Sequence, residues 1–94
     1  MWDEVRWDTS KARANLAKHG VSFMEAEVVV RDPLGLASMD ESHSADEDRL
    51  RVIGSSGDGR LLVVVVALDP AGTIRLISAR RPTRRERHAY EVGP

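Results

Sequence analysis

The fold is best predicted from the sequence LLVVVVAL at Leu61–Leu68, because eight consecutive apolar residues predict a strand that is buried on both faces. A strand of that kind lies at the centre of a sheet. Turn signals at Ser56–Gly59 and Asp69–Gly72 flank it, and both are of the kind that joins antiparallel neighbours. Arg49–Ser55 and Thr73–Arg81 are therefore predicted as the adjacent strands. The apolar stretch is too short to cross a membrane, which takes about 20 residues.

Three helices are predicted from their capping residues. A Ser or Thr followed three residues later by Glu forms a capping box, in which each side chain satisfies a backbone N–H of the other residue. Such boxes occur at Ser22–Glu25 and Thr83–Glu86, whereas the first helix begins with a simple N-cap at Asp8 or Thr9 and ends before Gly20. The predicted helices span residues 9–19, 22–30 and 83–92.

The order of the elements separates helices from strands. A weak edge strand at Trp2–Trp7 precedes the first two helices, a strand at Leu34–Met39 follows them, and Asp40–Asp48 is a polar loop. This segregation is typical of the α+β class, and 94 residues suit one core. We therefore predict a single domain over residues 1–94 with an antiparallel sheet of about four strands, two N-terminal helices and a C-terminal helix.

Positive charge is concentrated near the C-terminus. The formal net charge is −1, but residues 1–48 carry −6 and residues 49–94 carry +5. All nine basic residues of the second part are arginines, and six of them lie between residues 75 and 87 with Glu86 as the one acidic residue. The guanidinium group offers a planar fork of donors that matches phosphate or carboxylate. The pattern predicts a site for a polyanion or for an acidic partner surface.

Strand and helix geometry suggest how these arginines are arranged. Alternation along the last strand predicts Arg75 and Arg81 on one face and Arg80 on the other, together with Leu76. Arginines also occupy the first turn of the last helix, where cations oppose the helix dipole. This cost to helix stability favours a phosphate site at the end of the strand.

Residue types exclude several other kinds of site. The chain has no cysteine, so disulfides and thiolate zinc sites are excluded. His19, His43 and His88 lack the spacing of paired metal ligands, and the acids of residues 40–48 do not follow the calcium-loop pattern. Neither a phosphate-binding glycine loop nor a G-x-S-x-G elbow occurs. We therefore predict no metal, no cofactor and, without a signal or membrane segment, a cytoplasmic location.

Arginines without a metal suit cleavage of RNA. RNA carries its own nucleophile, the 2′-hydroxyl, so a protein can cleave it by orienting that group and stabilising the charge on the phosphate oxygens. A tyrosine, histidine or glutamate can move the protons. Two alternatives remain open, namely a non-catalytic nucleic-acid-binding module and a docking surface for an acidic partner. A core anchor is the alternative for Tyr90, and a solvent-facing position is the alternative for His88.

Two signatures resemble the BrnT-type toxins. The first lies near the N-terminus and comprises Trp7-Asp8, Lys18-His19-Gly20-Val21-Ser22-Phe23 and Glu25-Ala26. The second lies near the C-terminus and comprises Ile77-Ser78-Ala79-Arg80-Arg81, Thr83-Arg84-Arg85-Glu86-Arg87 and Tyr90-Glu91. Between them, Asp32-Pro33-Leu34 and Gly59-Arg60-Leu61 fit the same pattern. The resemblance runs over nearly the whole chain, with Met24 and Pro82 as departures.

The resemblance implies a RelE-like fold and a bacterial ribonuclease toxin of a type II toxin–antitoxin system, which inhibits translation and growth as part of a stress response. It also implies a BrnA-like antitoxin with a ribbon-helix-helix domain, a two-plus-two complex, and contact with operator DNA only through the antitoxin. Carried over to this chain, it implies that Arg80, Arg81, Arg84 and Arg85 bind the scissile phosphate, with His19 and Glu25 as further catalytic candidates. The implied RNA-binding residues are Lys11, Asn15, Lys18, Arg49, Arg87 and Tyr90.

Overall fold

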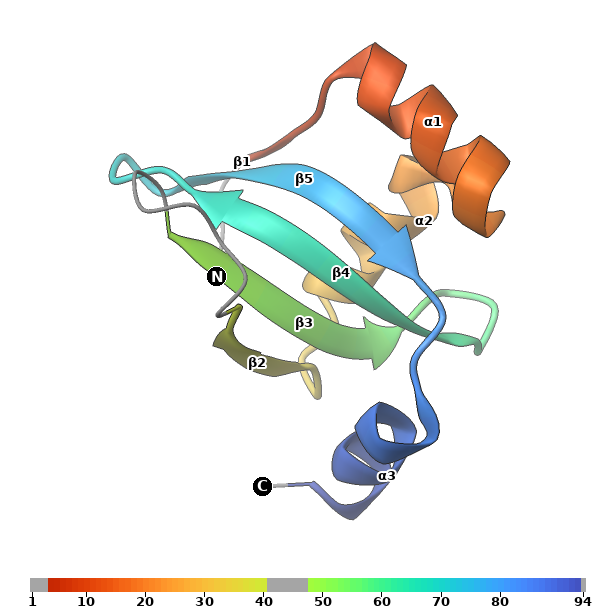
Figure 1. Ribbon diagram of the computed structural model, residues 1–94. Helices are drawn as coiled ribbons and strands as arrows, with labels where there is room; N and C mark the ends of the chain where they lie inside the picture. Colours follow the sequence, from red (N-terminus) through yellow and green to blue (C-terminus); the bar gives the residue numbers. More distant parts are fainter. Residues whose placement is uncertain (1–3, 41–47, 94) are drawn as a thin grey trace.

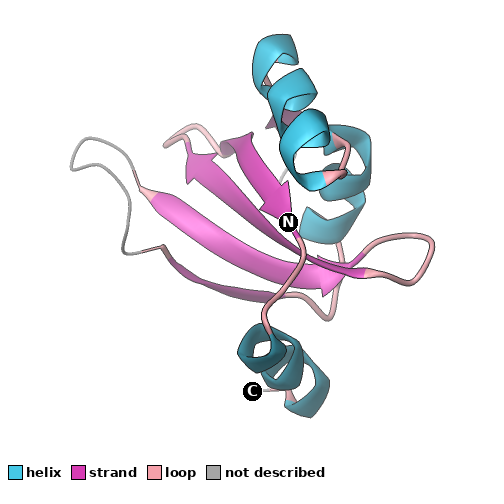
Figure 2. Cartoon of the chain, turned by 45° about the vertical axis from the view of Figure 1, so that its right-hand side comes forward, coloured by secondary structure: helices cyan, strands magenta, loops and turns pink. Residues whose placement is uncertain are grey.

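A five-stranded sheet with the order β1-β5-β4-β3-β2 organises the chain, and β4 is its central strand. The computed structural model describes residues 4–40 and 48–93. Two helices lie against one face of the sheet and the third lies at the other (Figure 1, Figure 2). The predicted α+β class is confirmed. The elements are β1 (Glu4–Arg6), α1 (Thr9–His19), α2 (Phe23–Val30), β2 (Leu36–Met39), β3 (Arg49–Ser55), β4 (Leu61–Leu68), β5 (Thr73–Arg80) and α3 (Arg84–Val92).

The two faces of the sheet carry apolar layers of different size. The larger layer lies under α1 and α2, where side chains of α2 pack on alternate residues of β3, β4 and β5. Its buried members are Val21, Phe23, Ala26, Val29, Val30, Val52, Leu62, Val64, Val66, Ile74, Leu76 and Ala79. On the opposite face Ile53, Leu61 and Val63 pack with Leu36 and with Tyr90 of α3. Because this second layer is small, α3 needs polar contacts to hold its position.

The helix ends follow the predicted capping signals with one difference. Asp8 accepts the Lys11 N–H at the start of α1, and Gly20 ends α1 in the left-handed region at φ 69°. Both reciprocal bonds of the capping box at Thr83–Glu86 are present. At Ser22–Glu25 only the serine half is formed, because the Glu25 carboxylate is bonded to Arg60. Glu25 therefore serves a long-range contact as well as its helix.

The sheet corrects the prediction of about four antiparallel strands. Strands β2, β3, β4 and β5 each pair antiparallel with the next strand along the chain. Strand β1 is a fifth strand, and it pairs parallel with β5, with Val5 opposite Ile74. Parallel neighbours need a long connection, which α1, α2 and the other strands supply. The three residues of β1 carry no signal for their direction, so pairing in parallel was not predictable. As expected, β1 is an edge strand.

A β-bulge in β5 changes the predicted faces of the arginines. Val66 lies opposite Leu76 while Val65 lies opposite Ser78, so Ile77 is an extra residue without a partner on β4. The bulge shifts the alternation by one position. Arg80 therefore lies opposite Val63, on the face toward α3, and not on the face of Leu76 as predicted. Sequence periodicity cannot reveal such a shift.

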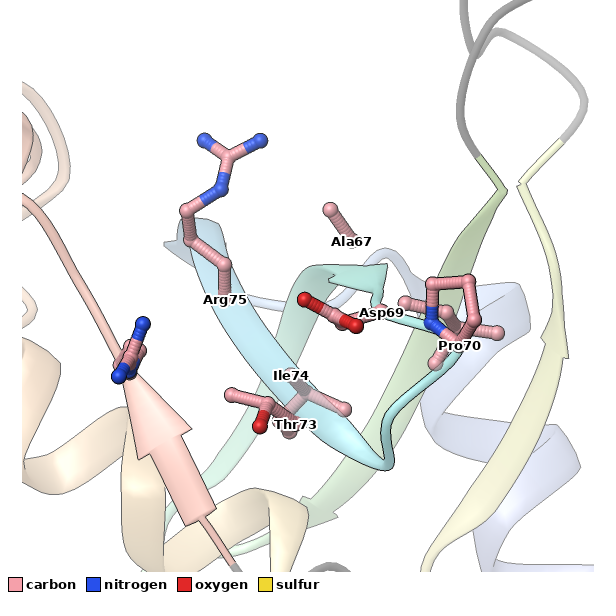
Figure 3. A pocket seen from close by; sticks show the side chains of 8 residues that line it. Ala67, Asp69, Pro70, Thr73, Ile74 and Arg75 are labelled. Atoms are coloured by element: carbon pink, nitrogen blue, oxygen red, sulfur yellow. The ribbon is translucent and has the colours of Figure 1, made fainter.

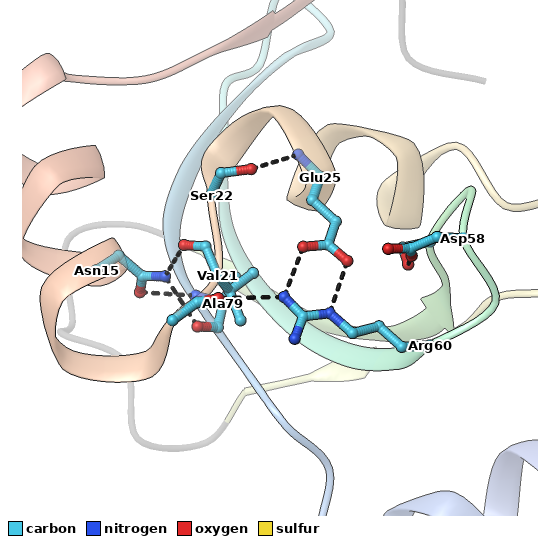
Figure 4. A network of polar contacts seen from close by, with 9 residues as sticks. Asn15, Val21, Ser22, Glu25, Asp58, Arg60 and Ala79 are labelled. Atoms are coloured by element: carbon cyan, nitrogen blue, oxygen red, sulfur yellow. Dashed lines mark hydrogen bonds and ion pairs between the residues drawn. The ribbon is translucent and has the colours of Figure 1, made fainter.

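Helix α1 turns a polar residue toward the sheet. The apolar Leu16 is 53% exposed, whereas the polar Asn15 is only 6% exposed. The Asn15 amide nitrogen donates to the carbonyls of Val21 and Ala79, and its oxygen accepts the Ala79 N–H, at 2.9–3.0 Å (Figure 4). The two bonds to Ala79 tie α1 to the outer edge of β5, and the bond to Val21 holds the segment that follows α1, so Asn15 faces the sheet.

Gly54 marks the closest approach of α2 to the sheet. A Cβ atom at this position would lie 2.8 Å from the Val29 carbonyl oxygen, which is backbone. We expect Gly54→Ala to destabilise the protein by about 1–3 kcal/mol through overpacking, measured by urea denaturation. Gly57→Ala is the matched control, because a Cβ there meets only the Val28 side chain at 4.0 Å. Equal stability of the two variants would contradict the close approach.

Candidate functional site

The predicted arginine cluster divides into two groups, and Arg80 belongs to the group that holds α3. Its Nη1 and Nη2 atoms donate to the two carboxylate oxygens of Glu86 at 2.9 and 3.0 Å. Arg51 lies 3.7 Å from the same carboxylate, which also accepts the Thr83 N–H. The hydrogen bond from Arg80 is the main reason that the pKa of Glu86 falls to about 2. Arg80 is thus engaged in an ion pair that fixes α3 to the sheet.

The second group lines a hollow at the end of β5. Arg81 follows β5, Arg87 lies on α3 and Arg60 precedes β4, and all three line a hollow of about 330 Å³. Gly59, Leu61 and Pro82 complete its wall. In the part of the chain that the structure describes, the side chains of Arg81 and Arg87 make no hydrogen bond or ion pair. Three cations around one hollow, two of them without a counter-ion there, make a site for an anion. We call it the arginine hollow.

Arg60 is a site residue that the charge pattern of the sequence does not indicate. Its Nε and Nη2 atoms bind the two oxygens of Glu25 at 2.7 and 2.6 Å, and Nη2 also donates to the Gly20 carbonyl at 3.2 Å (Figure 4). This pairing raises the pKa of Arg60 and lowers that of Glu25. Arg60 stands alone between a turn and an apolar strand, so no charge cluster pointed to it. The available signal was the Gly59-Arg60-Leu61 segment of the resemblance.

Arg84 and Arg85 extend the positive surface along α3. Both are exposed in its first turn, as predicted, and neither has a hydrogen-bond or ion-pair partner among residues 4–40 and 48–93. Arg84 and Arg87 are three residues apart and therefore share one side of the helix. Neither Arg84 nor Arg85 lines the arginine hollow, although Arg84 shares this side of α3 with Arg87, which does.

The candidates on α1 lie at a separate place. Lys11, Lys18 and His19 line a second hollow of about 210 Å³ together with Ile77 and Ser78 of β5. Asn15 also borders it, but its amide is committed to the backbone bonds described above. The structure therefore gives Asn15 a role in the fold. We call this second site the lysine hollow.

Two other predicted residues lie outside both hollows. The Tyr90 hydroxyl donates to Asp32 at 2.8 Å, and this bond raises the pKa of Tyr90. Tyr90 therefore has the features of a core anchor for α3. Arg49 begins β3 opposite Ala67, at the far end of the sheet from Arg81. The structure does not bring Arg49 to the other candidates.

A third hollow, of about 270 Å³, lies beside the turn between β4 and β5 (Figure 3). Arg6, Thr73 and Arg75 line it, but so does the carboxylate-bearing Asp69. An acidic wall makes it less suitable for a phosphate than the arginine hollow. His43 and the other residues 41–47 of the predicted polar loop lie outside the described residues, and within those ranges no group of His, Asp and Glu side chains is placed to hold a metal ion.

Comparison with known proteins identifies the family. A family model for the ribonuclease toxin BrnT of type II toxin–antitoxin systems matches residues 7–86. The chain belongs to the BrnT family. The matched range includes Glu25, Arg60 and Arg81, whereas Arg87 lies just beyond it. Membership confirms the resemblance that the two sequence signatures indicated.

A BrnT crystal structure shares the fold. The ribonuclease toxin BrnT of Brucella abortus is 25% identical to this chain and superposes with a TM-score of 0.61. The alignment covers 86% of this chain and 97% of the Brucella chain. No curated protein sequence matches this BrnT chain.

The Glu86 ion pair predicts a pH-dependent stability. Because the pKa of Glu86 is about 2 in the folded chain and near 4.5 ordinarily, its contribution is present above about pH 4.5 and is lost as the pH falls toward 2. We expect Glu86→Gln to cost about 1–3 kcal/mol at pH 7. The difference in unfolding free energy from the wild type should shrink below pH 4.5.

The matched control is Glu91→Gln, since Glu91 is exposed on the same helix and has no ion-pair partner among the described residues. Unfolding free energies from urea titrations at pH 7, 4.5 and 3 give the comparison. A Glu86→Gln deficit that stays constant over this range would contradict the assigned role of the ion pair.

Proposed function

We propose that this BrnT chain is a metal-independent endoribonuclease that binds the scissile phosphate of RNA in the arginine hollow. The observation that carries the proposal is the meeting of Arg60, Arg81 and Arg87 from three separate segments around one hollow. Membership in a family of ribonuclease toxins supports RNA as the substrate. Guanidinium groups are suited to this task because they stay charged and bind phosphate oxygens in pairs.

The reaction uses the 2′-hydroxyl of the substrate. Its oxygen attacks the adjacent phosphorus, the bond from phosphorus to the 5′-oxygen breaks, and a 2′,3′-cyclic phosphate remains. The hydroxyl proton leaves to a base and the 5′-oxygen gains a proton. Negative charge accumulates on the non-bridging oxygens in the transition state, and preorganised donors around them lower the barrier. Arg60, Arg81 and Arg87 supply these donors.

Glu25 acts in this scheme by positioning Arg60. Its carboxylate is held by two hydrogen bonds from Arg60, and a lowered pKa makes it a weak base. His19 is the better candidate for proton transfer, since histidine is the side chain most often used for it. His19 lines the lysine hollow and immediately precedes Gly20, whose carbonyl accepts a hydrogen bond from Arg60 of the arginine hollow, so it stands between the two hollows. The proposed roles thus differ from the sequence expectation, which made Glu25 catalytic.

The wider biological role follows from the family. The chain is proposed to act in the cytoplasm, to inhibit translation and growth by cleaving RNA, and to be neutralised by a BrnA-like antitoxin with a ribbon-helix-helix domain in a two-plus-two complex. Type II systems pair a toxin with a protein antitoxin, which supports the partner class. An antitoxin that covers the arginine hollow with acidic residues would block the site directly.

Cleavage of RNA in the presence of EDTA tests the proposal. We expect Arg81→Gln and Arg87→Gln each to reduce kcat about 10²–10³-fold, because each removes donors to the developing charge. Arg60→Lys keeps a cation beside Glu25 but removes the paired hydrogen bonds from the guanidinium group to the carboxylate, and we expect a similar reduction of kcat. Arg13→Gln is the matched control, since Arg13 is exposed on α1 beside Trp7 and lines neither the arginine hollow nor the lysine hollow. Circular dichroism verifies that every variant is folded.

Other outcomes distinguish the alternatives. Cleavage that requires magnesium would overturn the metal-independent mechanism. Salt-sensitive RNA binding without cleavage would indicate a non-catalytic binding module, and neither binding nor cleavage would indicate a docking surface.

A further inference from the structure

The lysine hollow has features of a second site for phosphate. Lys11 and Lys18 are seven residues apart on α1 and line the same hollow, so they share one side of the helix. Neither has an ion-pair partner in the described part of the chain, and no carboxylate lines the hollow. Two lysines without a counter-ion attract an anion to the space between them.

The outer edge of β5 provides the floor of this hollow. Strand β1 pairs only with Thr73–Arg75, so the remaining edge of β5 faces α1 and not another strand. The side-chain amide of Asn15 bonds the backbone N–H and carbonyl of Ala79, which a neighbouring strand would otherwise bond. Ile77 and Ser78, at the bulge, are left as the surface beneath Lys11 and Lys18.

The two hollows follow one another along β5. Ser78 lines the lysine hollow and Arg81 lines the arginine hollow, and three residues of extended chain span about 10 Å. Gly20 joins them on the helix side, because it follows His19 of the first hollow and accepts from Arg60 of the second. A ligand with regularly spaced phosphates can therefore occupy both hollows at once.

We propose that the lysine hollow binds a phosphate next to the scissile one, so that the substrate is single-stranded RNA longer than a dinucleotide that runs along the outer edge of β5. The inference rests on the proposed function, because it takes the arginine hollow as the place of cleavage. A single strand is required, since a base-paired nucleotide is not free to bring its 2′-oxygen into line with the leaving oxygen. Lys11 and Lys18 bind the substrate and take no part in the chemistry.

Binding of oligodeoxynucleotides tests this inference apart from catalysis, since they lack the 2′-hydroxyl and are not cleaved. The probes are thymidine oligonucleotides of two and six residues, and the proteins are the wild type, Lys11→Gln/Lys18→Gln and Arg13→Gln. We expect the double variant to lose affinity at least tenfold more for the hexamer than for the dimer. Its plot of log K against log salt for the hexamer should be shallower by about 0.7, because the contact with one phosphate is lost.

Arg13→Gln removes a charge from the same helix outside the lysine hollow, so it should change hexamer affinity less than twofold. Equal losses for the dimer and the hexamer, or no loss for either, would overturn the second site. Cleavage of the matching RNA oligonucleotides is the second readout. Failure of the wild type to cleave any RNA would refute the proposed function and leave the binding result to decide the second site alone.

Discussion

One extra residue in β5, Ile77, determines the face of the sheet on which Arg80 lies. Without this bulge Arg80 would project toward α1 and α2 with Leu76; with it Arg80 lies opposite Val63 and reaches Glu86. The next residue, Arg81, is then free to line the arginine hollow. The bulge therefore separates one arginine that stabilises the fold from another that is available to a ligand.

The carboxylates of Glu86 and Glu25 each form an ion pair with one arginine, and the two pairs have different consequences. Glu86 forms an ion pair with Arg80 and so anchors α3, whose apolar contact with the sheet is small. Glu25 forms an ion pair with Arg60, but the guanidinium group of Arg60 still lines the arginine hollow. These two ion pairs hold in place the elements around Arg81 and Arg87, which have no ion-pair partner in the described part of the chain. Such an arrangement binds an anion without first having to reorganise, which is the condition for electrostatic stabilisation of a transition state.

Local signals predicted much of this fold, and long-range contacts account for what they missed. The capping residues predicted where all three helices begin, and the apolar run at 61–68 predicted the central strand. The bulge at Ile77 and the parallel pairing of β1 depend on neighbours distant in sequence, so periodicity could not show them. The same holds for Arg60, whose role depends on a partner 35 residues away, and for Asn15, whose amide bonds residue 79.

In the proposed site Arg60, Arg81 and Arg87 bind one phosphate together, while Arg80 remains in its ion pair with Glu86. The most direct measurement is to titrate the protein with a thymidine dinucleotide and follow the guanidinium Nε–H resonances of these four arginines by NMR. We expect the signals of Arg60, Arg81 and Arg87 to shift together with one binding constant while that of Arg80 stays in place. A shift centred on Arg80, with Arg81 unaffected, would contradict it.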